Sequence, residues 1–226
     1  MDLELHPADN ISEESITFTN ERGQRERVRL HDYERVYSVP GLYEDVLLNY
    51  LNFASPEFLA ELLAKSYPLE SLRILDLAAG NGLAGEALFK RGSEYIIGAD
   101  ACAQAAPAAA RDYPSVYQEY ITVYADDPRL IQAVKEHKLN TLHCVGALGT
   151  ITVEQFQHLW AAFPVESILS VTCDDLSVLD NPFAAYFKRS AAAGELRIIK
   201  CEQFQHRQLM NGDPFIATAV IAEKLR

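Results

Sequence analysis

Leu72-Arg-Ile-Leu-Asp-Leu-Ala-Ala-Gly-Asn-Gly-Leu-Ala-Gly85 is the stretch that decides the fold of this chain. Its first six residues are mostly apolar and suit a β-strand, whereas small residues and three glycines follow and lead into a helical pattern. The stretch therefore predicts a strand, a tight turn and a helix. Glycines let a ligand approach the backbone closely, and a helix start offers free N–H groups to a polar or anionic group. We expect this turn to hold a nucleotide-like cofactor.

Two kinds of cofactor fit the turn. Residues 80–85 match the G-x-G-x-x-G fingerprint of dinucleotide-binding proteins, with Asp100 lying 20 residues after Gly80. S-adenosylmethionine is the alternative, and Asp76 favours it because this residue lies inside the strand end, four residues before Gly80. A fixed negative charge there opposes a diphosphate but suits an ammonium group. S-adenosylmethionine carries both an amino group and a sulfonium.

The segment Asp76-Leu77-Ala78-Ala79-Gly80-Asn81-Gly82, followed by Tyr95-Ile96-Ile97-Gly98-Ala99-Asp100, resembles motifs I and II of the class I S-adenosylmethionine-dependent methyltransferases. The resemblance extends from about residue 72 to the C-terminus. It implies that Asp76 and the backbone of the turn hold the methionine part, and that Asp100 accepts hydrogen bonds from both ribose hydroxyls. The family's usual glycine at position 78 is alanine here. The cofactor-binding residues so implied are Asp76, Ala78, Ala79, Gly80, Gly82, Asp100, Ala101, Asp126, Asp127 and Gly146.

Strand and helix patterns alternate after the turn, which indicates a parallel sheet. Two β-rich runs, 195–208 and 215–224, end the chain and are joined by Asn211-Gly212-Asp213-Pro214, a hairpin signal. The resemblance implies an α/β fold with a Rossmann-like, seven-stranded, mostly parallel sheet, a C-terminal antiparallel hairpin and helices on both faces. The other strands are expected at 95–100, 116–124, 139–145 and 168–172.

The N-terminal part is expected to differ from the core. Residues 1–28 are polar and predict a loosely attached start that contributes little core, whereas 31–67 has helical spacing. Helices ahead of motif I commonly cover the cofactor and the substrate in the family that this chain resembles. We therefore expect one methyltransferase-like domain over 1–226, with a tail and helical lid at 1–66 and a cofactor-binding core at 67–226. Candidate acceptor-binding residues in the lid are Tyr33, Tyr37 and Tyr43, although each alone is more typical of simple packing.

Two loops of the core contain candidate binding residues. Asp126-Asp127-Pro128 either recognises adenine, as the resemblance implies, or caps the helix that Pro128 starts, and both roles are compatible. Residues 146–150 take the place of motif IV, which faces the transferred methyl in the related enzymes, so Leu148 is a candidate acceptor contact. This loop lacks the Asn/Asp-Pro-Pro-aromatic sequence, which argues against N-methylation of bases or glutamine amides.

No catalytic residue is assigned. His143 lies within a predicted strand and is interpreted as a core histidine rather than a general base. A sulfonium methyl is already activated, so its transfer mainly requires a nucleophile aligned with it in a site closed to water. A base is needed only if the acceptor arrives protonated with a high pKa.

The bulk properties restrict the partners. The chain has 226 residues, a formal net charge of -12 and a pI of about 4.9, and no dense Lys/Arg stripe, so we expect no nucleic-acid partner. Its four cysteines lack C-x-x-C spacing, so no metal site is predicted. No signal peptide, long apolar run or lipidation signal is recognised, so we expect a cytoplasmic protein without membrane contact.

The sequence thus predicts an S-adenosylmethionine-dependent methyltransferase that transfers a methyl group to a small-molecule acceptor by in-line displacement and releases S-adenosylhomocysteine. One alternative is a non-catalytic or regulatory S-adenosylmethionine-binding protein. A nicotinamide-dependent Rossmann oxidoreductase is less favoured, because the chain leaves no room for a separate catalytic domain and contains no Tyr-x-x-x-Lys.

Overall fold

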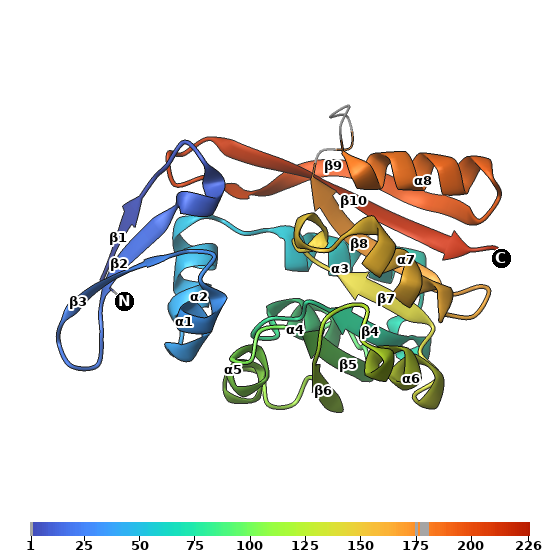
Figure 1. The fold of residues 1–226 in the computed structure, drawn as a ribbon, viewed down its shortest axis with the longest axis horizontal. Coiled ribbons are helices and arrows are strands. Elements are labelled where there is room, and N and C mark those ends of the chain that lie inside the picture. Colours follow the sequence, from blue (N-terminus) through green and yellow to red (C-terminus); the bar gives the residue numbers. More distant parts are fainter. Residues whose placement is uncertain (1, 175, 177–180) are drawn as a thin grey trace.

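The computed structural model describes residues 2–174, 176 and 181–226, and a seven-stranded sheet forms its centre (Figure 1). Five strands are parallel, and the last two in the chain form an antiparallel hairpin whose second strand pairs antiparallel with its neighbour. This confirms the predicted fold. The spatial order is β6 (Glu119–Thr122), β5 (Tyr95–Asp100), β4 (Arg73–Leu77), β7 (Thr141–Cys144), β8 (Ile168–Asp174), β10 (Pro214–Lys224) and β9 (Leu196–Gln208).

Helices cover both faces of this sheet. Successive strand residues point to opposite sides, and apolar residues on both sides provide surfaces on which helices pack. Leu75 and Leu77 of β4 pack in one apolar cluster with the helices of one face, whereas Ile74 packs in a second cluster on the other face. The first face carries α6 (Pro128–Glu136), α7 (Val153–Ala161) and α8 (Pro182–Ala192); the second carries α3 (Ser55–Ser66) and α4 (Leu83–Phe89). Within the described ranges, no helix is long and apolar enough to cross a bilayer.

Short elements complete the core. The helix α5 (Ala105–Asp112) follows β5, and 3₁₀ turns are found at η3 (Leu69–Ser71) and η4 (Leu148–Thr150). Local sequence explains where the longer helices begin. Thr152 and Gln155 form a reciprocal capping box at α7, and the Asn181 side chain accepts hydrogen bonds from two backbone N–H groups at α8.

The prediction of a loose N-terminal segment is wrong. Residues 3–29 form an antiparallel sheet of β1 (Leu3–His6), β2 (Ser15–Thr19) and β3 (Arg25–Arg29), with the 3₁₀ turn η1 (Ile11–Glu13) between the first two strands. Ile16 and Phe18 are 0% and 1% exposed. These two residues alternate with polar ones, so their apolar side chains lie on one face of the strand. The many polar residues of the segment hide this two-residue period in the sequence.

The apolar face of this small sheet packs on the predicted helical lid. The lid consists of α1 (Tyr33–Ser38), α2 (Leu42–Glu44) and the π-helical segment η2 (Asp45–Tyr50), and it shares one apolar cluster with the small sheet. The prediction that the lid extends to residue 66 is wrong, because α3 packs on the large sheet and belongs to the core. We call residues 2–53 the N-terminal unit. In Figure 1 this unit lies beside the far end of the long β9–β10 hairpin.

Hydrogen bonds join the N-terminal unit to that hairpin. Arg207 Nη2 donates to Glu14 Oε2 at 2.8 Å, and the Met210 N–H donates to Glu14 Oε1 at 2.7 Å. Both side chains of the ion pair are almost fully buried. The Gln208 N–H also donates to the Leu51 carbonyl at 2.6 Å. The hairpin therefore positions the N-terminal unit above one edge of the large sheet.

Candidate functional site

The predicted glycine turn leaves β4 at the carboxyl edge of the parallel strands, where ligands bind in open α/β sheets. Ala78, Gly80 and Gly82 have φ angles of +56°, +55° and +99°. An alanine in this left-handed region is strained by about 1 kcal/mol, which a glycine would avoid. At Gly80 a side chain would collide with the hydroxyl of Tyr37. The turn therefore requires glycine at this position both for its conformation and for the close approach of the lid.

Asp100 ends β5 directly beside the turn. Its Oδ2 accepts a hydrogen bond from the Gly80 N–H at 2.9 Å, and its Oδ1 accepts one from the Cys102 N–H at 2.8 Å. Burial raises the pKa of this carboxyl above its usual range. A carboxylate has about four acceptor positions, so two of them can still accept hydrogen bonds from a vicinal diol. The exposed Ala101 follows immediately.

Asp76 lies under the turn and is 1% exposed. Its Oδ2 accepts a hydrogen bond from the Tyr117 hydroxyl at 2.7 Å, whereas its Oδ1 has no hydrogen-bond partner among the described residues. Burial raises the pKa of this carboxyl to about 7. This carboxyl therefore does not carry the fixed negative charge that the sequence predicts, because a group with a pKa of about 7 is partly protonated near neutral pH. An ammonium group nearby would favour its ionised form.

The three lid tyrosines lie together over the turn. The rings of Tyr33 and Tyr37 stack with centroids 5.4 Å apart, and Tyr43 meets Tyr37 edge-on at 5.0 Å. Burial raises the pKa of all three hydroxyls, which therefore stay neutral. From the core side, the Tyr120 hydroxyl donates to the Gly80 carbonyl at 2.7 Å. The tyrosines thus lie at the predicted cofactor residues, and their contact with an acceptor stays a prediction.

Gly146 follows β7, where motif IV was predicted. Its φ is +68°, and its N–H donates to Thr172 Oγ1 at 2.7 Å. A Cβ here would lie 3.2 Å from Cε1 of His206, a residue of β9. The next predicted contact, Leu148, is 1% exposed and borders a pocket of about 1180 Å³. Phe215 and the start of α8 line the same pocket.

Asp127 and His143 have structural roles. Asp127 accepts a hydrogen bond from the Arg129 N–H at 2.8 Å, which confirms the capping interpretation for this residue, and Asp126 is exposed. His143 is fully buried and its Nδ1 lies 3.0 Å from Ser170 Oγ. Burial lowers the pKa of this imidazole to about 3. His143 is a core histidine, as predicted.

Sequence reasoning missed four residues of this region: Tyr117, Tyr120, Ser55 and His206. The first two come from the run Tyr113-Pro-Ser-Val-Tyr117-Gln-Glu-Tyr120, whose repeated aromatics next to a predicted strand end were an available signal. Ser55 and His206 had none, because they are 151 residues apart in the chain and meet only in the fold.

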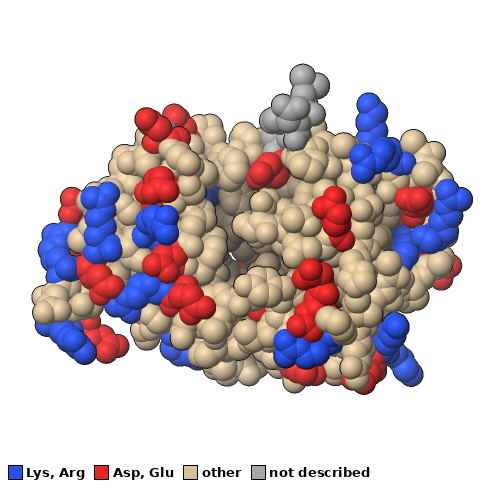
Figure 2. Space-filling view, viewed as in Figure 1, with Lys and Arg blue, Asp and Glu red and all other residues tan. Residues whose placement is uncertain are grey.

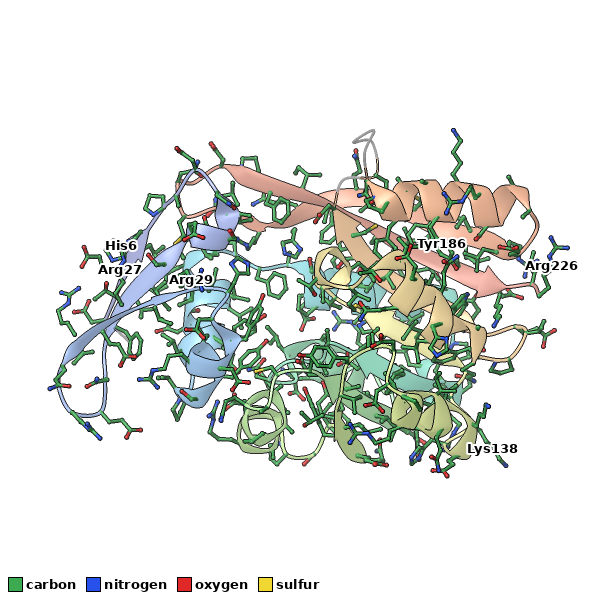
Figure 3. All side chains as sticks on the ribbon, viewed as in Figure 1. His6, Arg27, Arg29, Lys138, Tyr186 and Arg226 are labelled. Carbon is green, nitrogen blue, oxygen red and sulfur yellow. The ribbon has the colours of Figure 1, made fainter. Side chains whose placement is uncertain are left out.

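A hollow separates the N-terminal unit from the large sheet (Figure 2). Mostly uncharged residues border it in this view, and Lys and Arg are interleaved with Asp and Glu on the rest of this face. His6, Arg27 and Arg29 lie on the N-terminal sheet, and Lys138 and Arg226 lie at the other end of the molecule (Figure 3). No continuous basic surface leads to the hollow on the face that Figure 2 shows.

Comparisons with known proteins give structural neighbours only. No family model matches the sequence, and the curated proteins contain no significant match. A methyltransferase dependent on S-adenosylmethionine from Anabaena variabilis ATCC 29413 aligns with a TM-score of 0.58 and 13% identity, covering 87% of this chain and 96% of its own.

Two further structures align less extensively. A putative RNA methyltransferase from Pyrococcus horikoshii has a TM-score of 0.55 and 11% identity, over 75% of this chain and 81% of its own. Magnesium protoporphyrin IX methyltransferase from Synechocystis PCC 6803, solved with bound S-adenosylmethionine, has a TM-score of 0.54 and 14% identity, over 75% and 77%. At such identities the likeness shows a shared fold.

Proposed function

We propose that this protein is a methyltransferase that takes its methyl group from S-adenosylmethionine and transfers it to a small-molecule acceptor. The observation that carries the proposal is the Asp100 carboxylate, held against the glycine turn by two backbone N–H groups with acceptor positions to spare. This arrangement suits a ribose diol. The shared fold with methyltransferases supports the proposal.

The residues around the turn fit the rest of this cofactor. Gly80 and Gly146 have no side chain, so the Tyr37 hydroxyl and the His206 ring approach the backbone closely at this edge of the sheet. The unpartnered Oδ1 of Asp76 is available to favour a cationic amino group from beneath the turn. Neutral tyrosines of the lid cover the same turn without adding a positive charge, which would repel a sulfonium.

The bound cofactor would supply an activated methyl group. The protein then has to orient the acceptor in line with that methyl and exclude water. The lid and the loop after β7 border the hollow in which this alignment can occur, and they come from distant parts of the chain. The acidic net charge favours a small acceptor over RNA, and so does the lack of a continuous basic surface along the hollow on the face that Figure 2 shows.

A label-transfer assay tests this function. The protein is incubated with methyl-labelled S-adenosylmethionine and a cell extract separated into small-molecule, RNA and protein fractions. We expect label in the small-molecule fraction, and none with the Asp100→Ala variant. Label confined to RNA or protein would contradict the proposed acceptor class, and the absence of label from every fraction would favour a non-catalytic binding protein.

A further inference from the structure

His206 lies at a β-bulge in β9. In the β9–β10 pairing, Arg207 is opposite Phe215 and Gln205 is opposite Ile216, so His206 is an extra residue without a counterpart. Its carbonyl accepts a hydrogen bond from the Ala54 N–H at 2.9 Å instead of pairing with β10. Bulges of this kind redirect a side chain and are frequent next to active sites.

The redirected ring is held firmly on one side. Ser55 Oγ, at the first residue of α3, lies 2.6 Å from His206 Nδ1, and Ser55 is fully buried. Phe53 and Phe215 meet the ring edge-on, with centroid distances of 4.9 and 5.1 Å. Two separate parts of the chain, residues 53–55 and β10, therefore fix the plane and the orientation of this imidazole.

The other side of the ring faces the loop after β7. Cε1 and Nε2 lie 3.2 and 3.9 Å from the position that a Cβ of Gly146 would take. Nε2 makes no hydrogen bond within the described ranges, although the residue is half-buried. The arrangement leaves one imidazole nitrogen available beside the loop that takes the place of motif IV, which faces the transferred methyl if the resemblance noted in the sequence holds.

We propose that His206 is a catalytic residue that binds the acceptor, and that the acceptor carries a neutral hydroxyl group as its nucleophile. This inference rests on the proposed function. An uncharged imidazole with a free lone pair accepts a hydrogen bond from a hydroxyl, whereas it gives no benefit to a carboxylate or thiolate, which arrives without a proton. Burial and the neighbouring Arg207 lower the pKa of His206 to about 4, so the ring is neutral when the acceptor enters.

The transfer requires only the acceptor hydroxyl, the methyl and sulfur of the cofactor, and the His206 imidazole. The acceptor oxygen forms a bond to the methyl carbon as the carbon–sulfur bond breaks, and the electron pair of that bond stays on sulfur. The acceptor's proton passes to Nε2 of His206. The neutral ring carries its own proton on Nδ1, and this N–H donates a hydrogen bond to Ser55 Oγ. Ser55 is therefore a positioning residue, and it stabilises the imidazolium that forms when Nε2 takes up the acceptor's proton. The proton is lost to solvent when the product leaves.

NMR spectroscopy of the histidine nitrogens tests this placement without knowledge of the acceptor. The protein is labelled with ¹⁵N-histidine, and the His206→Gln variant identifies the His206 signals among the six histidines. Spectra at pH 7 are compared with saturating S-adenosylmethionine and with S-adenosylhomocysteine, which differ by the methyl group and the sulfonium charge. We expect the Nε2 signal of His206 to differ between the two complexes by several times more than any signal of His6 or His158.

Each outcome has a definite meaning. Equal His206 signals in the two complexes would overturn the placement of Nε2 at the methyl while leaving the proposed function intact. No response of any signal to either ligand, together with no heat of binding, would contradict the proposed function itself. In the Ser55→Ala variant we expect the tautomer ratio of His206 to change while the cofactor still binds, which a purely structural role of Ser55 in α3 would not produce.

Discussion

Asp76 is fully buried, and the Tyr117 hydroxyl donates a hydrogen bond to its carboxyl group. Its pKa rises from 3.8 to about 7 on folding because burial disfavours the charge. Between these two values the folded protein keeps a proton that the unfolded chain has lost. The contribution of Asp76 is therefore greatest at low pH and disappears as the pH rises through about 7.

The substitution Asp76→Asn tests whether ionisation of this carboxyl lowers the free energy of unfolding as the pH rises. Asparagine keeps the neutral form at every pH, so the variant should lack this part of the pH dependence. One pKa unit corresponds to about 1.4 kcal/mol, so between about pH 5.5 and pH 7 the wild type should lose about 2 kcal/mol of unfolding free energy relative to the variant. Urea denaturation at both pH values measures the difference.

The exposed Asp126 provides the matched control. The Asp126→Asn variant should follow the wild type over the same range. Parallel curves for the wild type and Asp76→Asn would show that the Asp76 carboxyl is ionised in the folded protein at both pH values, contrary to the account given above.

Single residues of the cofactor motif could be predicted from the sequence, whereas the residues proposed to contact the acceptor could not. Asp76, Gly80 and Asp100 lie within one continuous strand–turn–helix–strand unit, so local spacing places them together. His206 owes its position to a bulge, and no local pattern marks which residue of a long strand is the extra one. The near-neutral pKa of Asp76 also depends on burial that only the assembled fold provides.

The N-terminal sheet and the β9–β10 hairpin are joined by one buried ion pair. Glu14 and Arg207 have side-chain exposures of 2% and 5%, and the carboxylate also accepts the Met210 N–H. Replacing Glu14 by glutamine leaves the Arg207 charge buried without its counter-ion, which costs about 3–5 kcal/mol. We expect a loss of that size in the free energy of unfolding of Glu14→Gln, measured by urea denaturation.

The neighbouring Glu13 allows a matched comparison. Its ion pair with Arg29 is 3.7 Å long and largely exposed, so Glu13→Gln should change the free energy of unfolding by less than about 1 kcal/mol. Similar effects of the two variants would mean that the N-terminal sheet is not held to the hairpin by the buried pair.

Elements with strong local patterns were predicted well. The strands β4 and β5, the helix α4 and the C-terminal hairpin have apolar runs bounded by turn residues, so their types and approximate limits follow from the sequence. The N-terminal strands are short, and Arg-Glu-Arg-Val-Arg in β3 contains one apolar residue. Such a strand is stable only through its neighbours, and its pairing partners lie outside any local window.

The whole molecule places its candidate site between two parts that are distant in sequence. The carboxyl edge of the large sheet provides the glycine turn, Asp100 and Gly146, while the N-terminal unit covers this edge and rests on the far end of the hairpin. The fold explains why the same residues 206–210 meet both the lid and the loop after β7. A sequence pattern predicted the lid, but the contacts that hold it span almost the whole chain.

Calorimetric titration with S-adenosylmethionine and S-adenosylhomocysteine measures whether the glycine turn and Asp100 bind this cofactor. The wild type is compared with Asp100→Ala, and NADH is the control ligand. We expect one binding site for each adenosyl ligand. Loss of charged hydrogen bonds worth about 1.5–3 kcal/mol should weaken binding to Asp100→Ala at least about tenfold. Circular dichroism establishes that the variant is folded. Binding of NADH instead, no binding of either adenosyl ligand, or unchanged affinity in a folded Asp100→Ala protein would contradict the account.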